Sequence, residues 1–191
     1  MEMFEIVDDE DRVIGLRPRA ECHGNPALVH RVAHVLIVDG QGRLLLQKRS
    51  QNKDIQPGKW DTSVGGHLDP GEDYLAAARR EMAEELGLEG LPLTLLYQSR
   101  IRNEIESENV ATYLARHCGG VQPNPTEIDE VRYWAAAEIE AALGTGVLTP
   151  NFEQEWSAYQ RWCRRSSSAG SGPLLCGGDS FPDLIARMEQ E

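Results

Sequence analysis

The stretch GGHLDPGEDYLAAARREMAEELGL, residues 65–88, decides how this chain is expected to fold and where its chemistry lies. Two glycines and a proline-glycine turn come first, and Gly87 is a typical helix stop. Between them, apolar residues follow the spacing of one helix face: Leu75, Ala78, Met82 and Leu86. The pattern therefore predicts a short strand over 62–64 that ends at the glycines, a loop, and a helix from Tyr74 to Leu86.

Three glutamates gather on one face of this predicted helix. Glu81, Glu84 and Glu85 are three and four residues apart, so their carboxylates lie on the same side. Like charges at this spacing destabilise a helix unless a cation balances them, and carboxylate oxygens are ligands that Mg²⁺ and Mn²⁺ prefer. Gly66 permits close backbone approach and leaves its carbonyl available to the same ion. The alternative, and the usual one for an acidic run taken alone, is a solvated helix face.

Two further residues of the stretch are expected to support the carboxylates. Glu72 lies near the start of the helix, where the helix dipole favours an anion, and it can pair with Arg80 or Arg79. Arg80 also precedes Glu84 by one turn and can orient its carboxylate.

Charge and composition argue against several classes of partner. The 191 residues include 19 Lys and Arg against 31 Asp and Glu, which gives a formal net charge of −12. Because this balance opposes attraction to nucleic acid and to anionic membranes, we predict neither as a partner. Scattered cysteines and an acidic N-terminus without a signal-like pattern predict a cytoplasmic location. Whether the chain forms a homodimer is left open by the sequence.

The remaining pattern predicts an α/β fold with a mixed sheet covered by helices on both faces. A domain is expected over residues 1–165, followed over 166–191 by a Ser/Gly-rich linker and a tail that could end in a short docked helix. Strands are predicted over 4–8, 13–15, 32–38, 43–48, 93–99, 110–117 and 131–135, and further helices over 135–143 and 150–165.

The complete spacing within residues 65–88 resembles the signature of the Nudix hydrolases. The matching positions are Gly66, Glu72, Arg80, Glu81, Met82, Glu84, Glu85, Gly87 and Leu88. The resemblance implies an α/β/α sandwich and a Mg²⁺- or Mn²⁺-dependent enzyme that cleaves the pyrophosphate bond of a nucleoside diphosphate derivative. It also implies that Glu81, Glu84, Glu85 and the Gly66 carbonyl hold the metal, with Glu72 and Arg80 in support. The catalytic base would be a glutamate of this signature or one outside it, for which Glu127 is preferred to Glu130.

A wider resemblance, from Phe4 to Trp162, is to the Nudix branch that contains isopentenyl diphosphate isomerase and its hydrolase relatives. It is carried by residues 21–31, 44–67 and 148–156. The isomerase uses a cysteine and a glutamate as its proton donor and acceptor. Gly65 stands at the cysteine position, and the glutamate position falls on Asn109, with Glu106 and Glu108 in neighbouring registers. Isomerase-like activity is therefore an alternative ranked behind hydrolysis, and a non-catalytic nucleotide-binding module is the third reading.

Two more sets of side chains are candidates for the site. His23, His30 and His67 match the histidines with which the isomerase holds a metal, so they could bind a second metal or the substrate; otherwise they make local hydrogen bonds. Basic residues that flank the glycine strand could contact phosphate: Lys48, Arg49 and Lys59. Arg100 and Arg102, on a predicted loop, are further candidates, although surface cations are common.

Overall fold

The chain folds into two compact units. The computed structural model describes residues 2–104 and 106–168. Of the described residues, the first unit comprises those up to Leu36 together with Ser63–Ala115 and Val121–Asn124, and the second comprises Ile37–Thr62, Arg116–Gly120 and residues 125–168.

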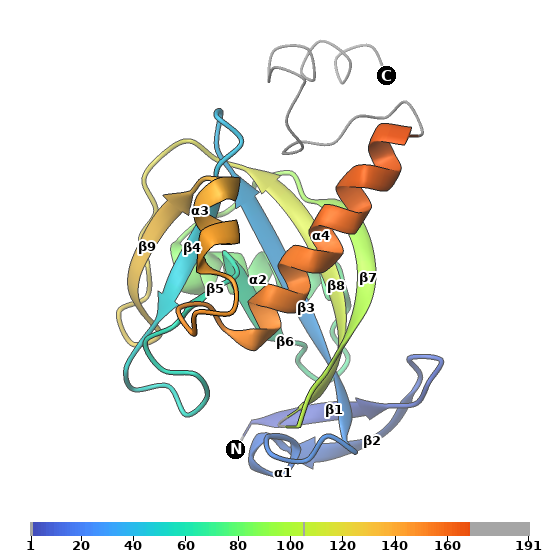
Figure 1. Cartoon of the computed structure of the whole chain (residues 1–191). Coiled ribbons are helices and arrows are strands. Elements are labelled where there is room, and N and C mark those ends of the chain that lie inside the picture. Colours follow the sequence, from blue (N-terminus) through green and yellow to red (C-terminus); the bar gives the residue numbers. More distant parts are fainter. Residues whose placement is uncertain (1, 105, 169–191) are drawn as a thin grey trace. The chain divides into compact units, whose positions relative to one another are not determined.

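The first unit is built on antiparallel strand pairs. β1 (Met3–Val7) and β2 (Val13–Pro18) form the predicted opening hairpin, and the short helix α1 (Arg19–Cys22) follows it directly (Figure 1). β3 (Val29–Val38) pairs with β1 through His30 and with β6 (Val64–His67) along its length. A second hairpin joins β7 (Thr94–Arg102) to β8 (Ser107–Arg116), and β8 also pairs with β3.

Helix α2 (Tyr74–Leu86) has the bounds that the periodicity predicts. Its N-terminus is capped by Asp73, whose side chain accepts a hydrogen bond from the Ala76 N–H at 2.8 Å. Gly87 ends the helix with φ of 65°, a left-handed conformation that glycine adopts without strain. The helix packs against β6 and buries the predicted apolar stripe, including Met82 and Leu86.

The second unit is centred on β4 (Leu44–Arg49). This strand pairs antiparallel with β5 (Trp60–Asp61) and with β9 (Ile128–Trp134), and a parallel bridge joins Trp60 to Leu148. Helices α3 (Ala136–Ala142) and α4 (Pro150–Ser168) complete the unit. The buried face of α4 carries the predicted residues Phe152, Trp156, Tyr159 and Cys163.

The α/β fold class with a mixed sheet and flanking helices is confirmed. Helix α4 extends to Ser168, three residues into the predicted linker, and the predicted tail over 169–191 lies outside the described residues. Within the described residues, every helix is too short or too polar to cross a membrane.

Most strand ends differ from the prediction by one to three residues, and two differences concern candidate site residues. The glycine strand includes Gly65 and Gly66 instead of ending at them, because both pair with β3, Gly65 opposite His34 and Gly66 opposite Ala33. Arg100 and Arg102 do not lie on a loop. They belong to β7, whose pairing with β8 continues to Arg102, and they alternate with the buried Ile101.

Candidate functional site

β6 and α2 approach each other closely at Gly66 and Glu81. A Cβ atom built on Gly66 would lie 1.9 Å from Cδ of Glu81, so any larger residue would displace this carboxylate. One residue earlier, the Gly65 N–H donates to Oε2 of the buried Glu85 at 3.3 Å. The strand therefore holds two of the three predicted metal-binding glutamates directly against its backbone.

Arg80 connects the carboxylates of the predicted site. Its Nη1 donates to Glu81 at 2.8 Å and to Glu84 at 3.3 Å, and its Nη2 donates to Glu72 at 2.9 Å. The same Nη2 donates to the backbone carbonyl of His67 at 3.0 Å. One guanidinium thus holds three acidic side chains in place and ties them to the end of β6.

The ionisation of this network follows from its hydrogen bonds. Burial acts to raise the pKa of Glu72, but hydrogen bonds from Arg80 and from the Asp69 N–H outweigh it, so the pKa lies below its usual value. The hydrogen bond to Glu72 is in turn the main reason that the pKa of Arg80 is raised. Both groups are charged at neutral pH, and a single guanidinium cannot neutralise Glu72, Glu81 and Glu84 together. The oxygen donors and the remaining negative charge fit a hard divalent cation such as Mg²⁺ or Mn²⁺.

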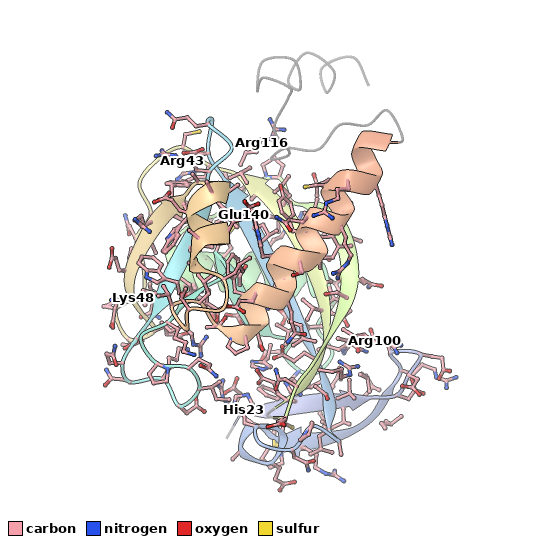
Figure 2. The ribbon with its side chains drawn as sticks, viewed as in Figure 1. His23, Arg43, Lys48, Arg100, Arg116 and Glu140 are labelled. Atoms are coloured by element: carbon pink, nitrogen blue, oxygen red, sulfur yellow. The ribbon has the colours of Figure 1, made fainter. Side chains whose placement is uncertain are left out.

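The three histidines form a second cluster. His23 follows α1, beside the β1–β2 hairpin (Figure 2), while His30 lies on β3 and His67 on β6. One ring nitrogen from each lies within 4.8 Å of those of the other two. Nε2 of His30 and Nε2 of His67 are each 3.8 Å from Oε1 of Glu108 on β8. Glu106 completes a second group within the same distance, together with His30 and Glu108.

The protonation states in this cluster suit metal binding. Nδ1 of His30 lies 3.2 Å from the Leu28 carbonyl, which can only accept, so Nδ1 carries the proton and Nε2 has a free lone pair. Nε2 of His30 and Nε2 of His67 are buried without a hydrogen-bond partner among the described residues. Burial lowers the pKa of His30 to about 4 and that of His67 well below its usual value. Neutral imidazoles with two nearby carboxylates fit an ion such as Zn²⁺ or Mn²⁺.

The positions that correspond to the isomerase acid–base pair do not form such a pair. Gly65 has no side chain, and Asn109, which falls at the glutamate position, is hydrogen-bonded to other residues. Its side chain donates to Asp11 at 2.7 Å and accepts from Arg102 at 2.8 Å. Glu108 lies at the histidines, and Glu106, two residues earlier, lies near His30; both point away from the face of Asn109, because successive residues of a strand point to opposite faces.

The other predicted residues belong to the second unit. Glu127 accepts a hydrogen bond from Nζ of Lys53 at 2.7 Å, which engages one of its two carboxylate oxygens. Arg49 donates to Asp61 and to the Ile55 carbonyl, at 3.3 and 3.0 Å. Lys48 lies on β4 opposite Trp60, and Lys59 immediately precedes β5. Lys53 was not identified from the sequence, because nothing local links it to a residue more than 70 positions away.

Comparisons with known proteins agree with the geometry of residues 65–88. Residues 28–164 match the family described as NUDIX domain. An uncharacterised Nudix hydrolase of Yersinia pestis is 36% identical over 174 residues, covering 91% of this chain and 92% of that protein. An isopentenyl-diphosphate Delta-isomerase of Brevibacterium linens is 34% identical over 149 residues, covering 75% of this chain and 82% of that protein. The crystal structure of DR0079 from Deinococcus radiodurans superposes with a TM-score of 0.73 at 25% identity, covering 82% of this chain and 98% of that chain.

Proposed function

Because this chain belongs to the Nudix hydrolase family, we propose that it is a divalent-metal-dependent enzyme that cleaves the pyrophosphate bond of a nucleoside diphosphate derivative. The observation that carries this proposal is the contact between Gly66 and the Glu81 carboxylate, with Arg80 joining Glu81 and Glu84. It supports a site in which oxygen ligands are already held together before a cation binds.

Each residue of this site has a proposed role. Glu81, Glu84 and Glu85, with the Gly66 carbonyl, would hold Mg²⁺ or Mn²⁺, which supplies charge neutralisation for the pyrophosphate and an acidified water. Arg80 orients Glu81 and Glu84, and Glu72 fixes the guanidinium of Arg80.

The general base is proposed to be one of the three glutamates of α2. Glu127 is the less suitable candidate, because the ammonium of Lys53 beside it stabilises the carboxylate that would have to accept the proton. Lys48, Arg49 and Lys59 remain proposed phosphate contacts, of which Arg49 is already engaged by Asp61.

The test is a substrate panel of nucleoside di- and triphosphates, nucleotide sugars and dinucleotides, assayed with Mg²⁺ and with Mn²⁺. Glu84→Gln and Glu85→Gln are expected to lower turnover of the best substrate by about 10²-fold or more, as removal of one charge-stabilising group does in other enzymes. Glu89→Gln, an exposed glutamate just beyond α2, serves as the matched control and should change little. Full activity in both variants would refute the proposed role of these carboxylates.

A second metal is proposed at the histidine cluster, held by His23, His30 and His67 with Glu108. This cluster and the isomerase relatives are the observations that favour isomerase-like activity as the second candidate function. Against it, Gly65 provides no thiol as a proton donor. We expect no deuterium to enter isopentenyl diphosphate in heavy water; exchange at an enzymatic rate would establish the isomerase instead. Tight nucleotide binding without turnover of any panel member would point to the non-catalytic module.

A further inference from the structure

Phe4 on β1 packs face to face on the histidine cluster. Its ring lies 4.0 Å from the ring of His67, with an angle of 15° between the planes, and 5.1 Å from the ring of His30, at 23°. His23 is the third neighbour, at 5.9 Å and 51°. Phe4 is only 2% exposed, so these imidazoles form one wall of the pocket that its ring fills.

β1, the strand that carries Phe4, is anchored by the side chain of Glu5 on its opposite face. The neighbouring residue Glu5 forms an ion pair with Arg31 on β3 and accepts a hydrogen bond from the Gly71 N–H at 3.0 Å. Ile6 pairs with His30 in the sheet. Since successive side chains of a strand point to opposite faces, the anchoring of Glu5 holds Phe4 against the histidines.

We propose that Phe4 is a positioning residue for metal binding at the histidine cluster. Stacking on a flat ring restricts the rotation of an imidazole about its Cβ–Cγ bond, and it leaves the nitrogens at the ring edge uncovered. Phe4 offers no hydrogen bond that would compete for those nitrogens. The stacked planes of His30 and His67 direct both Nε2 atoms toward Glu108, at 3.8 Å from the same oxygen. An aliphatic side chain of similar volume would fill the same space but would not fix the orientation of the imidazole rings.

This inference rests on the proposed second metal, and the experiment separates the two. Co²⁺ is titrated into the full-length protein while its visible absorption is recorded, because nitrogen ligands change the intensity and position of that absorption. The spectrum that is lost in His67→Ala defines the signal of the histidine cluster. Phe4→Leu and Phe4→Met remove the aromatic face while retaining apolar volume. Ile6→Val, in the same buried group of residues, is the matched control.

Phe4→Leu and Phe4→Met are expected to weaken Co²⁺ binding by about 10- to 100-fold and to alter the absorption, the usual effect of removing a group that orients metal ligands. Ile6→Val should remain within about two-fold of the unaltered protein. Thermal melting in EDTA verifies that each variant is folded, and the comparison uses whichever Phe4 variant melts cooperatively.

Two results would overturn the proposal. Wild-type Co²⁺ affinity and absorption in a folded Phe4 variant would show that the ring does not orient the histidines. An absorption unchanged in His67→Ala would remove the second metal and the role of Phe4 with it. Neither result affects the pyrophosphate hydrolysis proposed for α2, which the Glu84→Gln assay measures independently.

Discussion

The glutamate site on α2 and the histidine cluster are both polar, but they are held together by different forces. The glutamates are joined by charge, through the guanidinium of Arg80, and Glu84 remains well exposed. The histidines are held by burial and stacking, and the buried Nε2 atoms of His30 and His67 have no hydrogen-bond partner in the part of the chain that the structure describes. The first site can exist as a charged network in water, whereas the second has buried lone pairs whose desolvation only a ligand would offset.

The largest loss of hydrolysis is expected from Gly66→Ala, which tests the glutamate site alone. The new methyl group would lie 1.9 Å from Cδ of Glu81, so the carboxylate must leave its position. We expect hydrolysis to fall by about 10²- to 10³-fold and the free energy of unfolding by about 1–3 kcal/mol. Gly120→Ala is the control, because its Cβ would meet open space. Normal turnover in Gly66→Ala would mean that Glu81 is not needed at that position.

The surroundings of Gly66 show which features the sequence predicts and which it does not. The helix, its Gly87 end and the approach of Gly66 to the carboxylates all depend on residues within one stretch of 24, where periodicity and spacing act locally. The backbone pairing of Gly65 and Gly66 with β3 could not be predicted in this way, because it depends on a strand some 30 residues earlier.

Local sequence patterns do not predict the histidine cluster, because its residues and their neighbours come from separate strands, β1, β3, β6 and β8 among them. Spacing along the chain carries no signal for such a set, and only the resemblance to the isomerase brought the three histidines together. The resemblance does not decide which of Glu106, Glu108 and Asn109 corresponds to the isomerase glutamate. A shift of one residue in the alignment of a strand exchanges its two faces. Phe4 was indistinguishable from any other apolar residue of an opening strand.

A smaller effect is expected from Arg80→Lys, which would weaken the charged network without changing its net charge. Lysine cannot form the fork that contacts Glu72, Glu81 and the His67 carbonyl together. Hydrolysis should fall by about ten-fold or more, and the free energy of unfolding in urea by about 1.5–3 kcal/mol for lost charge-assisted hydrogen bonds. The adjacent and exposed Arg79→Lys should leave both quantities unchanged. If the two variants behave alike, the fork is not what joins the carboxylates.

In metal-free protein, the histidine cluster should lose stability at a higher pH than the glutamate site does. The folded pKa of His30 is lowered to about 4 by burial, against about 6.5 in an unfolded chain, so the unfolded state takes up a proton first. Stability is therefore lost as the pH falls from about 6.5 toward 4, by at most about 1.4 kcal/mol per pH unit for this group. Glu72, whose pKa is lowered, contributes stability that is complete above its unfolded value of about 4.3 and is lost only below it.

Urea unfolding in EDTA at pH 7 and pH 5.5 measures this difference. The loss of stability between the two pH values should be smaller in His30→Gln, which has no imidazole to protonate, and unchanged in Glu72→Gln. An equal loss in all three proteins would place the acid-sensitive group elsewhere.

The smallest effect is expected from Asn109→Ala, which tests whether the two faces of β8 differ as the contacts indicate. Asn109 loses hydrogen bonds to Asp11 and Arg102, so the free energy of unfolding should fall by about 1 kcal/mol while Co²⁺ binding stays unchanged. Glu108→Gln, one residue earlier, should show the opposite pattern, with weakened Co²⁺ binding, because its carboxylate faces the histidines. If Asn109→Ala weakened Co²⁺ binding as much as Glu108→Gln, the cluster would extend through the strand to both faces. The two faces of β8 would then not differ in their effect on the buried metal site.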